Sequence, residues 1–188
     1  MKQWAFAWVA LSLAAAADGR TPQNFPQEVI DAGGGYLKIF DEPPLWQPSA
    51  RRGYSERLRF LIGGSTRATW VIRIDRRPDG HTIAYFAKHD GHQIVEDEEY
   101  RVSEKDYQEL QQLIRDAKLW SIYPEFYQFT DDRAICIDGM LVIFERTNAA
   151  GYRYSEGNAQ CTLGAGQLAV AAKFMEIAKH SGLERLLR

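Results

Sequence analysis

TRATWVIRIDRRPDGHTIAYFAK, the stretch from Thr66 to Lys88, predicts a β-hairpin and decides the fold. Its first half alternates as a half-buried strand does, with Trp70, Ile72 and Ile74 on one face. The segment Arg77-Pro78-Asp79-Gly80 predicts the turn, because proline presets φ and glycine accepts a positive φ. A hairpin centred between Pro78 and Asp79 pairs apolar residues on one face: Ile74 with Ile83, Ile72 with Tyr85, and Trp70 with Ala87.

A second turn follows at Asp90-Gly91, a strong two-residue hairpin signal. It predicts that the chain changes direction again near the acidic run Glu96–Glu99, before Tyr100-Arg101-Val102. The first part of the chain is therefore expected to form an antiparallel meander. The predicted pairs around the second turn are His89 with His92, Ala87 with Ile94, and Phe86 with Val95.

Two amphipathic segments predict helices. Ser103 is the expected N-cap of the first, with Asp106 three residues on in an approximate capping box, and this helix should end near Trp120. The second is expected over Gln167–His180. Their apolar positions recur at helical spacing: Tyr107, Leu110, Leu113, Ile114 and Ala117 in the first, and Leu168, Ala171, Phe174, Met175 and Ala178 in the second.

The two cysteines, Cys136 and Cys161, bear on the strands between the helices. Met140–Arg146 and Tyr152–Glu156 read as strands joined by a turn. A long hairpin centred between Asn148 and Ala149 would set the cysteines opposite one another, as a disulfide requires. The alternative is a tight turn at Asp138-Gly139 that joins Arg133–Ile137 to Met140–Arg146. The disulfide geometry favours the long hairpin.

These elements predict an α+β fold, in which an antiparallel sheet is covered on one face by two α-helices. The sheet comprises the β-meander and the long C-terminal hairpin. Residues 56–188 are expected to form one domain. Residues 18–55, rich in proline and glycine, are expected to form an irregular extended arm with one short strand at Tyr36–Phe40, lying against that domain.

The N-terminus predicts export. Met1–Ala17 has one positive residue, an apolar run and small residues at its end, which is the order of a signal peptide. The apolar run is shorter than the ~20 residues that span a bilayer. Cleavage before Asp18 would leave a periplasmic or secreted protein, and in such an oxidising compartment Cys136 and Cys161 are expected to be bridged.

Composition and missing motifs exclude several classes. A formal net charge of −2 argues against nucleic-acid binding. The sequence has no nucleophile elbow, zinc-protease motif, phosphate-binding loop, Cys-x-x-Cys or dinucleotide fingerprint. His89 and His92 flank a turn that could present both rings to a metal, yet two ligands at a hairpin tip fall short of the three or four that a site needs. We therefore expect no metal and no cofactor.

Three exposed features are the candidate partner-binding surface, since charged blocks steer association and aromatic residues are enriched at interface hot spots. They are the hairpin tip, the start of the acidic run and an aromatic, acidic loop. Their residues are His89, Asp90, His92, Glu96, Asp97, Tyr123, Phe126, Tyr127, Asp131 and Asp132. A basic group where the arm meets the domain is available to hold an anion or to pair with the acidic run: Arg51, Arg52, Arg57 and Arg59.

Carboxylates are the weak catalytic candidates. Glu145 follows an apolar strand face and is the acid most plausibly buried, and Asp138 is its nearest partner, with Asp131 and Asp132 as others. Hydrolysis of a glycoside would need two such groups across a cleft. The simpler interpretation is a cross-strand hydrogen bond between Glu145 and Tyr152.

Two classes of function remain. The sequence favours a non-enzymatic binding protein, such as an immunity protein or inhibitor that binds an envelope-acting effector or hydrolase. The alternative is a small envelope hydrolase that uses paired carboxylates. Burial discriminates between them: convergence of Glu145 and an aspartate in a concave pocket favours the enzyme, and an exposed apolar and acidic patch favours the binding protein.

Overall fold

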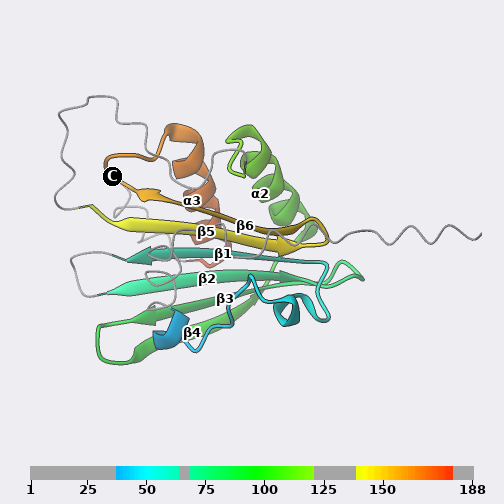
Figure 1. Ribbon diagram of the computed structural model, residues 1–188, viewed down its shortest axis with the longest axis horizontal. Helices are drawn as coiled ribbons and strands as arrows, with labels where there is room; N and C mark the ends of the chain where they lie inside the picture. The colour runs from blue at the N-terminus through cyan, green and yellow to red at the C-terminus, as the bar shows by residue number, and fades with distance from the viewer. Residues whose placement is uncertain (1–36, 64–67, 121–138, 180–188) are drawn as a thin grey trace, which may run out of the picture.

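The computed structural model describes residues 37–63, 68–120 and 139–179. These residues form a six-stranded antiparallel sheet and two 13-residue α-helices (Figure 1), which confirms the predicted α+β class. The strands lie in the order β4-β3-β2-β1-β5-β6. In chain order the elements are η2 (Pro48–Arg51), β1 (Glu56–Gly63), β2 (Thr69–Arg76), β3 (Thr82–His89), β4 (Ile94–Arg101), α2 (Glu104–Asp116), β5 (Leu141–Asn148), β6 (Gly151–Asn158) and α3 (Ala165–Ile177).

Strand β1 lies in the middle of the sheet, and the sequence prediction assigned no strand there. It pairs with β2 on one side and β5 on the other, and all eight of its residues are buried. Leu58, Phe60 and Ile62 face the helices, whereas Arg57 and Arg59 face the opposite side. The meander and the C-terminal hairpin are therefore parts of one sheet that β1 joins.

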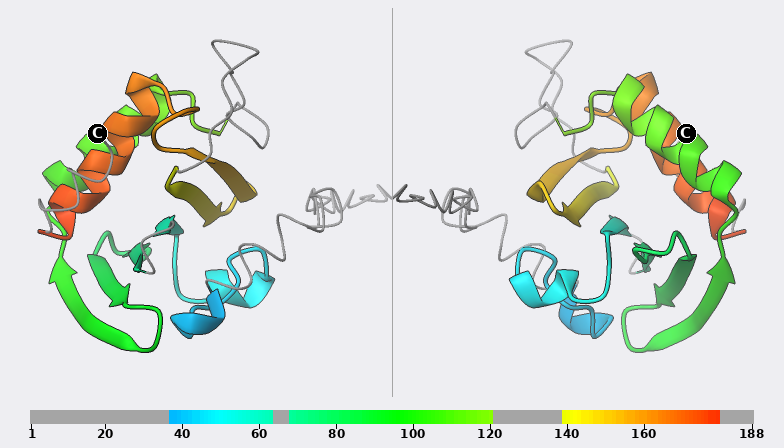
Figure 2. Two further views of the ribbon diagram at one scale, coloured as in Figure 1. Left: turned by 90° about the vertical axis from the view of Figure 1, so that its left-hand side faces the viewer. Right: turned by 90° about the vertical axis from the view of Figure 1, so that its right-hand side faces the viewer.

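The two helices lie side by side on one face of the sheet, as predicted (Figure 2). Their buried side chains, among them Leu110 and Phe174, belong to one apolar cluster with the facing strand residues. The Phe60 ring lies 5.2 Å from that of Phe144 and 5.5 Å from that of Phe174.

The ends of the helices follow local signals. Ser103 caps α2, and its hydroxyl accepts a hydrogen bond from the Asp106 backbone N–H at 3.1 Å. The last helix begins and ends slightly earlier than predicted, at Ala165–Ile177. No helix within the described ranges is long and apolar enough to cross a bilayer.

The arm covers the other face of the sheet over its described part, residues 37–55. Residues 37–39 are helical, so the strand predicted at Tyr36–Phe40 is wrong. The Glu42 N–H bonds to the Leu37 carbonyl at 2.9 Å. A helical turn sets Leu37 and Phe40 on the same side, where they pack on the sheet, while a strand would point them apart.

The β2–β3 hairpin differs from the predicted register by one residue. Ile74 pairs with Ala84, not Ile83, and Ile72 pairs with Phe86, not Tyr85. Trp70 likewise pairs with Lys88 instead of Ala87. The reason is Gly80, whose φ of +85° closes a three-residue loop in place of the assumed two-residue turn.

That one-residue difference exchanges the two faces of β3. Ala84 and Phe86 point into the helix-covered core, and Ile83 and Tyr85 point to the opposite face.

The second hairpin also differs from its prediction. His89 pairs with Ile94 instead of His92. The register shifts at a bulge between Lys88 and His89, and Phe86 pairs with Glu98 instead of Val95. Ala87 correspondingly pairs with Asp97 and not with Ile94. The acidic run therefore lies within β4, at the edge of the sheet, and not at a change of direction after it.

The last hairpin is centred between Ala149 and Ala150, one position beyond the predicted centre, so each pairing shifts by two residues and every side chain keeps its face. Pairing ends at Leu141 and Asn158. Cys161 follows in an exposed turn. The strand ladder thus stops before it reaches Cys161, and Cys136 and Asp138 lie outside the described residues.

Truncation of the central aromatic residue tests the core. Phe60→Ala should lower the free energy of unfolding by about 3–5 kcal/mol, because it opens a cavity between β1 and α3. Urea denaturation of the purified protein measures this. Val95→Ala is the control, since Val95 is 46% exposed and its loss should change stability by less than about 0.5 kcal/mol. Equal effects of the two changes would contradict the packing described here.

Candidate functional site

A network of buried ion pairs lies on the face of the sheet opposite the helices, and Arg59 is its centre. The Arg59 side chain is fully buried. Its Nε lies 2.6 Å from Glu145 Oε2, and its Nη1 lies 3.3 Å from Glu42 Oε2 and 2.8 Å from the Pro43 carbonyl. Burial alone would lower the pKa of Arg59, but the charges of Glu145 and Glu42 outweigh it and raise that pKa. One cation thus joins β1, β5 and the arm.

Both oxygens of Glu145 are occupied. Arg59 donates to one, and the Tyr152 hydroxyl donates to the other at 2.7 Å. The predicted hydrogen bond between Glu145 and Tyr152 is therefore confirmed, although Tyr154 is the residue directly across the strand pair. Glu145 is 3% exposed, so a substrate has no access to its carboxylate.

A second group of ion pairs adjoins the first. Arg57 binds Asp75 through two hydrogen bonds of 2.7 and 2.9 Å, and Arg73 Nε lies 3.0 Å from the same carboxylate. Arg73 also contacts Glu42. The four arginines that the sequence grouped together are thus divided: Arg57 and Arg59 are buried in ion pairs with Asp75, Glu42 and Glu145, and they do not pair with the acidic run.

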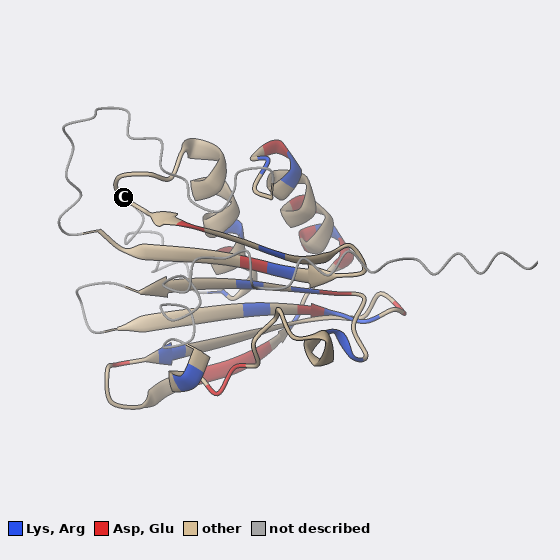
Figure 3. Cartoon of the chain, viewed as in Figure 1, with Lys and Arg blue, Asp and Glu red and all other residues tan. Residues whose placement is uncertain are grey.

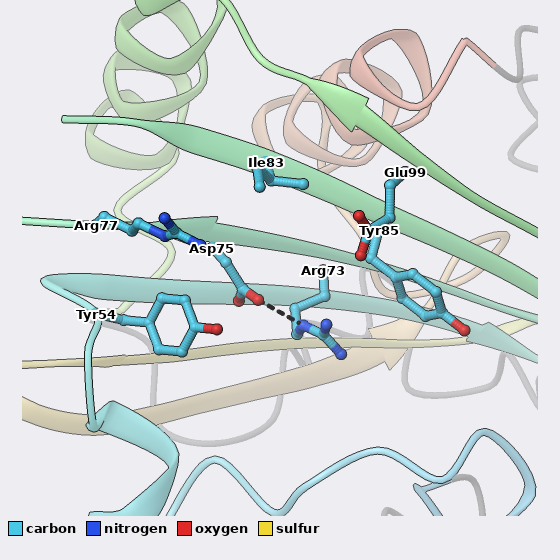
Figure 4. Close-up of a pocket in the computed structure, with 7 residues that line it drawn as sticks. All are labelled: Tyr54, Arg73, Asp75, Arg77, Ile83, Tyr85 and Glu99. Atoms are coloured by element: carbon cyan, nitrogen blue, oxygen red, sulfur yellow. Dashed lines mark hydrogen bonds and ion pairs between the residues drawn. The ribbon is translucent and has the colours of Figure 1, made fainter.

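Beside this network lies a pocket of about 180 Å³ (Figure 4). Tyr54 and Tyr85 stand on either side of Arg73. The guanidinium of Arg73 lies 4.9 Å from the centre of the Tyr85 ring, and that of Arg57 lies 4.4 Å from the Tyr54 ring. The pocket is lined by Tyr54 from the arm, Arg73, Asp75 and Arg77 from β2 and its end, Ile83 and Tyr85 from β3, and Glu99 from β4.

The chemistry of this pocket suits binding. Burial and the nearby Glu42 carboxylate raise the pKa of Tyr85, so its hydroxyl remains a donor at neutral pH. The oxygens of Asp75 already accept hydrogen bonds from Arg57 and Arg73. Among the described lining residues there is no histidine, serine, threonine or cysteine. The described lining of the pocket therefore offers charged and aromatic contacts.

The hairpin tip is a closed turn, and His89 is not on its surface. His89 is 9% exposed, packs against Phe40 at 6.0 Å between ring centres, and accepts a hydrogen bond at Nδ1 from the Gly91 N–H at 3.0 Å. Its prediction as a partner-binding residue is therefore not supported. The described ranges hold no group of three His, Cys, Asp or Glu side chains arranged to bind a metal.

Asp90 and His92 do lie at the surface of the tip. The backbone N–H groups of Gln93 and His92 donate to the Asp90 carboxylate and lower its pKa. Asp90 thus stabilises the turn, while the exposed His92 side chain remains available to a partner.

Strand β4 carries the exposed part of the candidate surface. Ile94 is 38% and Val95 46% exposed, and Glu96–Glu99 follow directly. The acidic stretch of β4 lies at the edge of the sheet (Figure 3). No ion pair between described residues includes Asp97 or Glu99. Glu99 also lines the pocket, so the acidic strand and the pocket form one surface. Tyr123, Phe126, Tyr127, Asp131 and Asp132 lie outside the described residues.

The sequence analysis missed the pocket. It placed Arg73 and Asp75 correctly on the face away from the core, but it assigned Tyr85 to the core face. The signal that could have corrected this was Gly80, since a glycine at the third position of Pro-Asp-Gly also fits a three-residue loop.

No protein-family model matches the chain, and no curated protein is significantly similar to it in sequence.

Removal of the central cation tests the ion-pair network. Arg59→Met keeps most of the side-chain volume but leaves Glu145 buried without a cation and Glu42 with Arg73 alone, so the free energy of unfolding should fall by about 3–5 kcal/mol. Urea denaturation at neutral pH measures the loss. Arg52→Met, at an exposed arginine of the same segment, should change stability by less than about 0.5 kcal/mol. A loss of the same small size in both variants would show that Arg59 does not hold the network together.

Alkaline titration tests the Tyr152 hydrogen bond. Burial and the Glu145 charge raise the pKa of Tyr152 well above its ordinary value. A raised folded-state pKa contributes stability below the unfolded value of about 10, and this stability is lost as pH rises. We expect Tyr152 to ionise only when the protein unfolds, seen as a late step in phenolate absorbance. Burial and Glu56 also raise the pKa of Tyr107, so Tyr152→Phe should lower the amplitude of the late step by one phenolate, and an unchanged titration curve would contradict the assignment.

Proposed function

We propose that the protein is an exported, non-enzymatic binding protein of the cell envelope, of the immunity or inhibitor type. Its partner would be a protein with a basic surface, such as an envelope-acting effector or hydrolase. The observation that carries the proposal is the exposed edge strand β4, in which two apolar residues, Ile94 and Val95, adjoin the acidic run.

An edge of this kind suits a specific partner. Apolar contact at Ile94 and Val95 supplies affinity, and the carboxylates of Asp97 and Glu99 speed association with a basic surface and select for it. Tyr54 and Tyr85 line the pocket together with Glu99, and tyrosine is enriched among the residues that dominate binding energy. The same acids would keep β4 from pairing with a second copy of this chain.

The alternative, a hydrolase with paired carboxylates, has less support. A general acid needs a raised pKa, and a nucleophile needs access to substrate. Glu145 is enclosed and bonded at both oxygens, and Asp75 is held by two arginines. Glu145 and Asp75 are thus committed to ion pairs.

Export and the disulfide belong to the same proposal. The apolar N-terminus supports secretion, and in an oxidising compartment Cys161, which lies in an exposed turn, would be bridged to Cys136. Such a bridge would anchor the end of β6 to the chain that precedes β5.

Partner binding can be tested with charge reversal. The mature protein is used to isolate binding proteins from envelope extract, and each candidate is purified and its dissociation constant measured directly. Asp97→Lys combined with Glu99→Lys should weaken a true partner at least tenfold, because both substitutions repel a basic surface. Asp116→Lys on α2 is the matched control and should leave binding unchanged, since Asp116 is an exposed acid on the helical side.

Equal weakening by both changes, or no purified partner that binds directly, would overturn the proposed binding surface. Turnover of a cell-wall or ester substrate that disappears in Glu145→Gln would favour the hydrolase instead.

Export can be tested separately by mass spectrometry of protein recovered from the periplasm of an expressing bacterium. We expect a chain that begins at Asp18 and in which Cys136 and Cys161 react with an alkylating reagent only after reduction. An uncleaved N-terminus contradicts export, and two reactive thiols without reduction contradict the bridge.

A further inference from the structure

A group of hydrogen-bond donors without acceptors lies on the helix-covered side of the sheet, away from the pocket. Arg146 on β5 is directly opposite Arg153 on β6. Like charges in directly opposed positions destabilise a strand pair. No carboxylate of the described residues forms an ion pair with either arginine. Within the described ranges, the two positive charges therefore have no ion-paired carboxylate.

The surroundings add further donors. The Arg146 guanidinium lies 5.2 Å from the centre of the Trp120 ring. Arg146 Nε and Trp120 Nε1 are both buried and have no hydrogen-bond partner. The buried hydroxyl of Ser155, two residues from Arg153 on the same face of β6, also lacks a partner. Buried polar groups are nearly always satisfied, so donors gathered in this way call for an acceptor.

Glu56, the acid whose charge acts on Arg146, is already hydrogen-bonded to other residues. Glu56 accepts hydrogen bonds from the Tyr107 hydroxyl at 2.5 Å and from Asn148 Nδ2 at 2.9 Å, and it also contacts Gln111. Arg153 donates only to a backbone carbonyl, that of Tyr152, at 2.9 Å. Burial lowers the pKa of Arg146; the charge of Glu56 opposes this shift but does not outweigh it, and the charge of Arg153 adds to it.

We propose that Arg146, Arg153 and Trp120 form a binding site for a phosphate or sulfate group. Two guanidinium groups match the charge of a dianion, and arginine binds tetrahedral oxyanions through paired N–H groups. The indole N–H of Trp120 supplies a further donor. The three side chains are only partly buried, so the anion can reach them from solvent. This site is independent of the proposed partner surface on β4.

The test uses the full mature protein with inorganic phosphate, sulfate or acetate, each compared with chloride at the same ionic strength. The ¹⁵N-labelled protein is titrated while the Trp120 indole signal, assigned by its loss in Trp120→Phe, is followed by NMR. We expect a saturable shift of this signal with phosphate and sulfate, and weaker binding of acetate, which carries one charge. The relative affinities of phosphate and sulfate identify which dianion the site prefers.

Variants decide whether the arginines carry the binding. Arg146→Met and Arg153→Gln should each raise the dissociation constant for phosphate at least tenfold. Both should fold, because each removes a like-charge contact. Arg101→Gln, at an exposed arginine on β4, should leave it unchanged and controls for the general stabilising effect of phosphate. No saturable shift, tighter binding of acetate than of phosphate, or the same affinity in Arg153→Gln and Arg101→Gln would overturn the site.

Discussion

The ion-pair network on the face of the sheet opposite the helices depends on the buried charge of Arg59. A guanidinium in the centre of a sheet is tolerated only when carboxylates compensate it, and here they come from β5 and from the arm. Glu145 therefore holds the C-terminal hairpin to β1, and Glu42 holds the arm over the sheet. The ion pairs of Arg57 and Arg73 with Asp75 extend the same arrangement toward the pocket.

The two faces of the sheet are thus built by different forces. The helical side is an apolar core, centred on Phe60 and its aromatic neighbours, whose stability comes from burial without directional bonds. The other side combines a smaller apolar cluster, in which Leu37 and Phe40 pack on the sheet, with directed ion pairs of the arginines that contact Tyr54 and Tyr85 at the pocket. Fixed polar groups give a ligand or partner a defined orientation, and for this reason the proposed partner surface includes the pocket.

Local signals in the sequence predicted the fold class, the cap of α2 and the alternation of β2. They did not predict β1, since Arg57 and Arg59 read as exposed charges until Asp75, Glu42 and Glu145 are placed beside them by tertiary structure. The pocket was missed for a related reason: the side on which Tyr85 lies depends on a single residue of register, which the φ of Gly80 sets. The Glu145–Tyr152 hydrogen bond was predictable because the register error was two residues, and a shift of two residues along a strand leaves each side chain on the same face of the sheet.

The central position of β1 also determines how the chain must fold. The meander β2–β3–β4 and the hairpin β5–β6 join near neighbours in sequence, and such local pairings form quickly. The contact between Arg59 and Glu145 spans 86 residues, so its loop-closure entropy has to be overcome before the sheet is complete. Because β1 precedes β5 in the chain, the edge of β1 that pairs with β5 stays unpaired until the residues up to β5 have been synthesised. The slow step of folding is therefore expected to be the docking of the C-terminal hairpin on β1, an event that sets the time for which a chaperone would be needed.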